Sequence, residues 1–295
     1  MKPRRISGNR TAEDILRSYY EELGEKKNKG QNSGDRKITP SNIANPGDYI
    51  ILEGNQPDLL VPINRLGLTQ ETGQALRDLN FYDNLTQRAG TDNNRNQKPL
   101  DPLGFLGYIN HEEAQSLALK LNGFVLPANL YGNFLKLLID GTENKAKVYD
   151  GNGNIFPSTG LTQVLNEITE VRTPWRAEHL DCRFNMQSSG DEQKLHIKYH
   201  KFDGSGKLIE CDEVLDENTL MSDKVPGIKL HSWLENPTSQ GLPRKEIGTG
   251  DLWYWCPRNG AVGRFGASSG GVSLSCNLDP QGSDSAFGVR VAKIK

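Results

Sequence analysis

The chain has 295 residues, of which 35% are hydrophobic and 24% charged, and this balance excludes a protein that is disordered throughout. Its formal net charge is -2 with both signs interspersed, which excludes an overall field that attracts nucleic acid or a membrane surface. The start, "MKPRRISGNRTAED", has no apolar region typical of a signal peptide, and no apolar run reaches membrane-spanning length. We therefore expect a soluble protein that recognises its partner through local chemistry.

Residues 1–45 are predicted to form an amphipathic helix followed by a polar linker. Thr11 is a suitable N-cap, and apolar residues from Ile15 to Leu23 recur at helical spacing. The Gly-, Asn- and Ser-rich stretch that follows has the composition of a linker. The main domain is expected to span residues 46–295.

The first half of the main domain alternates strand and helix signals. We expect a strand in "DYIILEG" (48–54), an apolar stretch in "DLLVPINRLGL" (58–68), one helix over 69–87 and a polar loop over 88–102. A second helix should begin after the N-cap Asn110 and stop at "NG".

A further helix should follow Pro127 and end at Gly141. Turn residues then predict hairpins over 146–156 and 194–215, and from Gly160 onward we expect a loop-rich β region closed by "SAFGVRVAKIK". The predicted fold class is α+β, with two helices packed on small antiparallel sheets and long loops on one side.

Motifs for metal binding and catalysis are weak. "DGNGN" at Asp150 resembles half of a calcium loop, but Ile155 and Leu161 stand where that loop needs Gly and Glu, so a hairpin turn is favoured. His196 and His200 share a strand face with a lysine between them and, as we expect, no nearby acidic ligand, which favours a solvated face. We predict no metal and no cofactor.

The cysteines and serines give no catalytic motif either. Cys182, Cys211, Cys256 and Cys276 form no C-x-x-C pair, and their spacing leaves the disulfide state open. The chain also lacks a G-x-S-x-G elbow, and "GASSGG" lacks the G-K-[ST] of a phosphate-binding loop. We therefore predict no catalytic residue and no enzymatic activity.

The aromatic run Trp253, Tyr254 and Trp255 allows two interpretations. In a strand, alternation would bury Tyr254 and place both tryptophans on the opposite face. All three residues would pack in the core in the first interpretation, and in the second the tryptophans would form a rim of anchors beside a binding face.

Two stretches resemble a known fold. "HEEAQSLALKLNGFVLPANLYGNFLKLL" resembles the helix, "LP", helix segment of the C-type lectin fold as it occurs in formylglycine-generating-enzyme-like domains, and "FGVRVAKIK" resembles its closing strand. The run "VGRFGASSGGVSLSCNLDPQGSDSAFGVR" resembles the variable region of target proteins of diversity-generating retroelements, placing such a region at about 251–295.

The resemblance implies a fixed frame with changeable positions between its members. The frame would be Val262, Arg264, Phe265, Ala267, Leu274, Cys276, Pro280, Gln281, Ser283, Gly288, Val289 and Arg290. The changeable, ligand-binding positions would be Gly266, Ser268, Gly270, Gly271, Ser273, Ser275, Asn277, Leu278, Gly282 and Asp284, with Tyr254 and Cys256 as further members.

The function implied is ligand binding by a diversified display protein of a phage, an archaeal virus or a microbe. Its partner would be a protein or glycan on a host or neighbouring surface, without nucleic acid or membrane insertion. The N-terminal helix would join the domain to a virion, a partner or a second copy. Oligomeric state and ligand identity stay open.

Two departures from the wider family limit its other activities. The Glu-Pro-Asn and Gln-Pro-Asp tripeptides of calcium-dependent sugar binding are missing, and so is the R-G-G-S-W context of the formylglycine-generating cysteine pair. The alternatives are a formylglycine-generating-like enzyme with an altered active site and a structural virion component with a flexible Gly/Ser surface loop.

Overall fold

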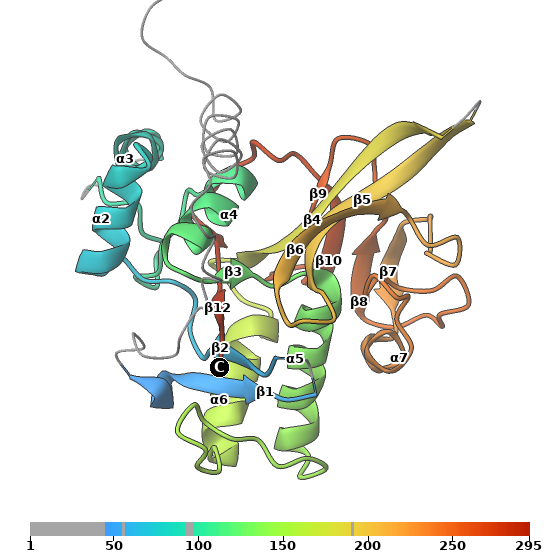
Figure 1. The fold of residues 1–295 in the computed structure, drawn as a ribbon, viewed down its shortest axis with the longest axis horizontal. Coiled ribbons are helices and arrows are strands. Elements are labelled where there is room, and N and C mark those ends of the chain that lie inside the picture. The colour runs from blue at the N-terminus through green and yellow to red at the C-terminus, as the bar shows by residue number, and fades with distance from the viewer. Residues whose placement is uncertain (1–44, 55–56, 93–96, 190–191) are drawn as a thin grey trace, which may run out of the picture. The chain divides into compact units, whose positions relative to one another are not determined.

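The computed structural model describes residues 45–295 except 55–56, 93–96 and 190–191 (Figure 1). The described residues all belong to one compact unit. The helix and linker predicted for residues 1–45 lie outside the described part of the chain, Asn45 excepted.

The smaller of two sheets joins the beginning and the end of the described chain. Its strands β1 (Tyr49–Leu52), β2 (Leu59–Pro62), β12 (Val291–Ile294) and β3 (Phe124–Val125) pair antiparallel in the order β1-β2-β12-β3. The strand predicted at 48–54 and the closing strand are confirmed. β12 therefore lies between two strands that precede it by a long stretch of chain (Figure 1).

The larger sheet has eight strands and carries most of the second half of the chain. It has the order β6-β5-β4-β9-β10-β8-β7, and β11 pairs with β4. The pairs β10·β8 and β11·β4 are parallel and the others are antiparallel. The strands are β4 (Arg176–Ser189), β5 (Glu192–Phe202), β6 (Leu208–Val214), β7 (Lys224–Ile228), β8 (Leu252–Trp255), β9 (Val262–Ser268), β10 (Gly271–Leu278) and β11 (Phe287–Gly288).

Both predicted hairpins exist, but they differ in extent. β5 and β6 form a seven-pair ladder from His196↔Val214 to Phe202↔Leu208. At 146–156 a single bridge, Tyr149↔Ile155, flanks a turn in which the Asp150 carboxylate accepts hydrogen bonds from two backbone N–H groups. This is the geometry of an Asx-type turn, in agreement with the predicted hairpin turn.

The helices begin and end at α2 (Gln70–Asp78), α3 (Tyr82–Thr91), α4 (His111–Lys120), α5 (Ala128–Thr142), α6 (Ser158–Thr169) and α7 (Leu230–Glu235), and a 3-10 turn, η2, covers Pro46–Asp48. The prediction for α4 is confirmed in detail. Asn110 Oδ1 accepts from the Glu113 N–H at 2.9 Å, and the Asn110 N–H donates to Glu113 Oε2 at 3.0 Å, which is a complete capping box.

Two helix predictions are wrong. The single helix expected over 69–87 is split into α2 and α3, because Asn80 adopts φ 60° and ends the first helix. α6 lies in the region predicted to be loop-rich β. Its buried residues Leu161, Val164 and Ile168 are three, four and seven apart, which is helical spacing.

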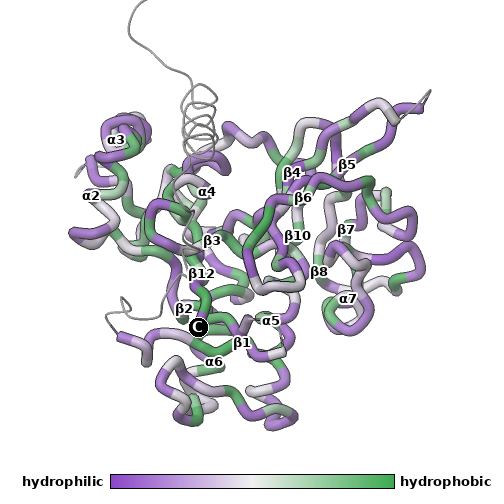
Figure 2. The backbone as a smooth tube through the Cα atoms, viewed as in Figure 1, coloured by the Kyte–Doolittle hydropathy of each residue, from purple (hydrophilic) through white to green (hydrophobic). Residues whose placement is uncertain are grey.

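The core joins the two sheets through α5. Tyr131 of α5 packs on Phe265 of β9 at 5.3 Å between ring centroids, and one continuous cluster of buried apolar residues includes Ile50 of β1 and Leu274 of β10. Figure 2 shows hydrophobic colour along β2 and β12 and mainly hydrophilic colour along β5. The overall class is α+β as predicted, with more helices and a larger sheet than expected.

A buried ion pair also links the sheets. Arg290, just before β12, donates from Nη2 and Nε to the Glu178 carboxylate of β4 at 2.7 and 3.0 Å. Its Nη1 donates to the Pro62 carbonyl of β2. Both side chains are almost fully buried, so removing either partner would leave an unpaired charge in the core. Among the described residues, no helix is long and apolar enough to cross a membrane.

Candidate ligand-binding face

Strands β8 and β10 each bury the side chains of one face and leave those of the other face partly exposed to solvent. Leu252 and Tyr254 of β8 are buried, whereas Trp253 and Trp255 are partly exposed. Tyr254 also donates its hydroxyl hydrogen to the Leu220 carbonyl at 2.9 Å. The alternation predicted for the aromatic run is therefore confirmed, and neither tryptophan is a core residue.

The register places both tryptophans beside small residues. The parallel pairing of β10 with β8 sets Ser273 opposite Trp253 and Ser275 opposite Trp255. Opposite positions in paired strands carry their side chains on the same face. On the other side of β10, Gly271 pairs with Ser268 of β9. We call Trp253, Trp255, Ser268, Gly271, Ser273 and Ser275 the β8–β10 face.

Trp253 lies over the turn between β9 and β10. A Cβ atom added to Gly270 would stand 2.5 Å from Trp253 Cη2, and one added to Gly271 would stand 3.3 Å from Cε2. The indole therefore lies against both glycines, and Gly270 is still exposed to solvent on its other side. Ser268 stabilises the turn, because its Oγ accepts a hydrogen bond from the Gly270 N–H at 3.2 Å.

Residues 279–287, which we call the wall, lie along one side of this face. Arg264, opposite Ser275 in β9, donates from Nη2 to the carbonyls of Asp279 and Gly282 at 3.1 and 3.0 Å. Its guanidinium carbon stands 3.6 Å from the centre of the Phe287 ring. Burial lowers the pKa of Arg264 to about 10, so it is charged at neutral pH.

Two buried histidines connect Arg264, which holds the wall, with the start of α4. His179 of β4 accepts from Arg264 Nε at Nδ1 (3.3 Å), and its Nε2 stands 2.9 Å from the Ile109 carbonyl. His111 Nε2 stands 3.0 Å from the Leu180 carbonyl. Because carbonyl oxygens only accept, each Nε2 carries the hydrogen. Burial lowers the pKa of His111 to about 4 and that of His179 well below its usual value.

The predicted ligand-binding positions separate into accessible and buried groups. Gly270 is exposed, and Ser268, Gly271, Ser273, Ser275, Asn277, Leu278, Gly282 and Asp284 are partly exposed. Asn277 and Leu278 follow at the end of β10, where the pairing with β9 shifts. The structure brings the β8–β10 face together, whereas Gly282 and Asp284 lie in the neighbouring wall.

Asp284 and Gly282 also serve the wall itself. Asp284 Oδ1 accepts from the Ala286 N–H at 2.9 Å, and its carbonyl accepts from the Tyr108 N–H. The Gly282 carbonyl accepts from Arg264. Substitution of the Asp284 side chain would remove a turn-stabilising hydrogen bond, so this position is less free than the serines of β10.

Three of the predicted positions are buried and form no part of the accessible face. Tyr254 and Cys256 have no exposed surface and point into the core. A Cβ on Gly266 would stand 2.6 Å from the Arg176 carbonyl oxygen of β4, so the backbone of the next strand occupies that space. A surface ligand would therefore not contact these residues.

Most of the predicted frame is core. Val262, Phe265, Ala267, Leu274, Cys276 and Val289 are at most 1% exposed. Arg264 and Arg290 are buried through the contacts given above. Gln281 is exposed, and Pro280 and Ser283 are partly exposed, so for these three burial is not the reason for a fixed identity.

The other candidate groups have structural partners. All cysteines are free thiols; Cys182, Cys256 and Cys276 are buried, and burial raises the pKa of Cys256 to about 11 and that of Cys276 well above its usual value. His196 and His200 each contact a carboxylate, Asp212 and Asp181, at 3.0 and 2.9 Å. The expected lack of acidic neighbours was wrong, because these come from strands β6 and β4. No group of three potential ligands gathers among the described residues.

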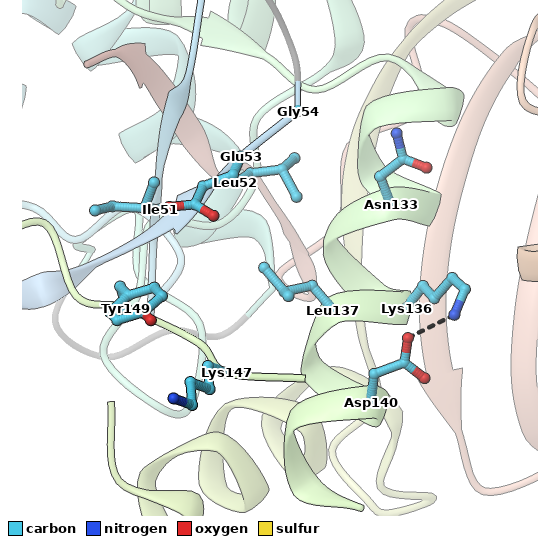
Figure 3. A pocket seen from close by; sticks show the side chains of 10 residues that line it. All are labelled: Ile51, Leu52, Glu53, Gly54, Asn133, Lys136, Leu137, Asp140, Lys147 and Tyr149. Carbon is cyan, nitrogen blue, oxygen red and sulfur yellow. Dashed lines mark hydrogen bonds and ion pairs between the residues drawn. The ribbon is translucent and has the colours of Figure 1, made fainter. Parts of the chain in front are cut away.

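A pocket of about 260 Å³ lies elsewhere and had no signal in the sequence (Figure 3). It is formed by the end of β1, one side of α5 and the chain around Tyr149, with Leu137 pointing into it. Lys136 and Asp140 at its rim are paired with each other at 2.5 Å. Its lining combines apolar side chains with polar and charged groups, of which Lys136 and Asp140 are paired, and we assign it no chemistry.

No family model matches this chain, and no curated protein or solved structure matches it either.

Proposed function

We propose that this chain is a non-enzymatic display protein with a C-type lectin fold. Its β8–β10 face binds a protein or glycan on another surface, and a diversity-generating retroelement varies the residues of that face. The observation that carries the proposal is the two-sided character of β10. Ser273 and Ser275 stand beside two partly exposed tryptophans, while Leu274 and Cys276 between and after them are fully buried.

The chemistry of the face suits a variable binding surface. Tryptophan supplies a large, rigid contact area and is enriched among residues that dominate binding energy. Small neighbours leave these indoles accessible and can be replaced without loss of core packing. The buried frame then keeps the strands in register whatever residues occupy the face.

The fold part of the proposal rests on the segments that carry the resemblance. "HEEAQSLALK" forms α4, the "LP" dipeptide precedes α5, and the final segment supplies β11 and β12. Helix, connection, helix and closing strand thus occur in the expected order. A small sheet that joins the first and last strands of the described chain is compatible with this assignment.

Cys276, the cysteine that the enzymatic alternative would use as its nucleophile, is not accessible. A cysteine nucleophile needs a thiolate that a substrate can reach. Cys276 is fully buried, and burial raises the pKa of its thiol well above the usual value. We therefore favour binding over a formylglycine-generating-like reaction.

Population sequencing of codons 251–295 tests the diversification. We expect substitutions at the codons of Ser268, Ser273 and Ser275, with adenines at the matching positions of a template repeat. The codons of Leu274 and Cys276 should stay unchanged. Substitutions spread evenly over buried and accessible codons would contradict the proposal.

Binding is tested separately with a glycan array and a displayed random-peptide library. Trp255→Ala should weaken capture of any member bound by the wild-type chain at least tenfold. Met186→Ala is the matched control, because Met186 is a 40% exposed apolar residue on the β4–β5 hairpin. Equal capture by the wild type and the Trp255 variant would remove the β8–β10 face from the proposal.

A further inference from the structure

Trp253 lies in close contact with the turn at Gly270–Gly271. We propose that residue 270 is a specificity-determining position that acts through Trp253. Glycine allows the indole to lie on the turn, and any larger residue forces it off. Residue 270 thereby decides which aromatic surface the β8–β10 face presents, without needing to touch a ligand itself.

The contact is extensive and involves the six-membered ring. A Cβ on Gly270 would stand 2.5, 3.0 and 3.5 Å from Trp253 Cη2, Cζ3 and Cζ2. The first of these distances is far inside van der Waals contact, so ring and side chain cannot occupy their places together. The ring belongs to a partly exposed residue, so we expect it to be displaced toward solvent.

The backbone separates the roles of the two glycines. Gly271 has φ +148°, a conformation that residues with a side chain rarely adopt, so substitution there strains the turn itself. Gly270 is not among the glycines with positive φ. At position 270 the main obstacle to a side chain is therefore the indole, and substitution there should move Trp253 rather than refold the turn.

The neighbouring pairs define where the effect acts. Trp253 stands opposite Ser273, whereas Trp255 stands opposite Ser275, two pairs further along the same two strands. Displacing the first indole takes it off the turn, whereas Trp255 lies beside a different serine, Ser275. One residue change would thus alter half of the aromatic surface of the face.

The displacement follows from the contact alone, while its consequence for recognition rests on the proposed function. The two parts can therefore fail separately. A chain in which Gly270→Ala moves Trp253 but no array member is bound would contradict the proposed function and keep the positional inference. A chain that binds ligands but shows no movement of Trp253 would contradict the inference alone.

The test uses the full chain labelled with 5-fluorotryptophan and fluorine NMR. The chain has four tryptophans, and Trp253→Phe assigns the signal of residue 253. We expect Gly270→Ala to shift the Trp253 signal by more than its linewidth and to raise its solvent isotope shift, with the signals of Trp175 and Trp233 unchanged. Gly204→Ala is the control, because a Cβ there meets no atom within 4 Å. An unshifted Trp253 signal in Gly270→Ala would overturn the inference.

A double-mutant comparison covers the case in which several signals move. Gly270→Ala should lower the unfolding midpoint when Trp253 is present and have no further effect in a Trp253→Ala background. If the loss is the same in both backgrounds, the turn backbone and not the indole opposes a side chain at 270, and the inference is wrong.

Discussion

The two faces of strand β10 share one backbone and differ in what their side chains contact. Leu274 and Cys276 are fully buried against the core, while Ser273 and Ser275 stand in partial contact with solvent. β10 is hydrogen-bonded to β9 on one side and β8 on the other, so the ladder holds both faces equally. The difference teaches that every second side chain can hold a strand in place, while the identity of the side chains between them is free to change.

Strand β9 is paired with β10 but does not share its accessible face. Gly266 and Arg264 pair with Ser273 and Ser275, so the register assigns them to the same side of the sheet. They are nevertheless buried, Gly266 against the backbone of the adjacent strand β4 and Arg264 beneath the segment that ends at Phe287. Freedom to vary therefore depends on what covers a position, and strand alternation alone does not define it.

Truncation on the buried face should have the largest effect. Leu274→Ala removes a fully buried side chain that packs in the core cluster, and we expect it to lower the free energy of unfolding by about 2–5 kcal/mol. Denaturant unfolding measures this. Ser273→Ala, one residue away on the accessible face, is the matched control and should change it by less than about 0.5 kcal/mol. Equal losses would refute the two-sided description.

Acid should lower the free energy of unfolding through the buried side chain of His111. The pKa of His111 is lowered from 6.5 to about 4 in the folded chain, so below pH 6.5 the unfolded state binds more protons than the folded state. Stability from this group is complete above pH 6.5 and is lost as the pH falls to about 4, by roughly 3 kcal/mol in total.

Unfolding curves between pH 7 and pH 4 measure this loss, and His111→Gln is the comparison. Glutamine keeps an N–H donor for the Leu180 carbonyl but has no titrating ring. Its stability should fall less steeply with pH than that of the wild type. Parallel curves would show that His111 is not held neutral by burial.

Gly266→Ala tests whether position 266 of β9 has room for a side chain. The added methyl would stand 2.6 Å from the Arg176 carbonyl oxygen, so the strands must separate slightly. We expect a loss of about 1–3 kcal/mol in the free energy of unfolding. Gly204→Ala, at a position with open space, should show no loss from crowding. If Gly266→Ala is as harmless as the control, position 266 belongs with the variable positions after all.

The smallest effect is expected on the accessible face itself. Ser273→Asn enlarges a partly exposed side chain on β10, and the free energy of unfolding should change by less than about 0.5 kcal/mol. Thermal unfolding in parallel with the wild type is sufficient to detect a larger change. A loss above 1 kcal/mol would mean that a neighbour packs on Ser273 and that the face is not free.

Local signals in the sequence predicted much of this arrangement. The capping box at Asn110, the turn between β5 and β6 and the alternation around Tyr254 each involve residues that are close in the chain. Such patterns act through local geometry, so a single sequence reveals them. The two faces of β10 follow from the same period of two in "VSLSCNL".

The remaining features depend on contacts between distant segments. The burial of Gly266 comes from the backbone at Arg176, and the partners of His196 and His200 come from other strands. The order of the large sheet, with β10 between β9 and β8, has no signature in any one segment. Asn80 ended a helix in a left-handed conformation that glycine more commonly signals.

The central place of β12 in the small sheet has a consequence for folding kinetics. β12 follows the whole segment from β9 to β11 in the chain, yet it pairs with β2 and β3, which come far earlier. Closing the small sheet therefore encloses the segment that carries the face in the chain loop between β3 and β12. Contacts of such long sequence separation form slowly. We therefore expect the pairing of β12 with β2 and β3 to be a slow step of folding.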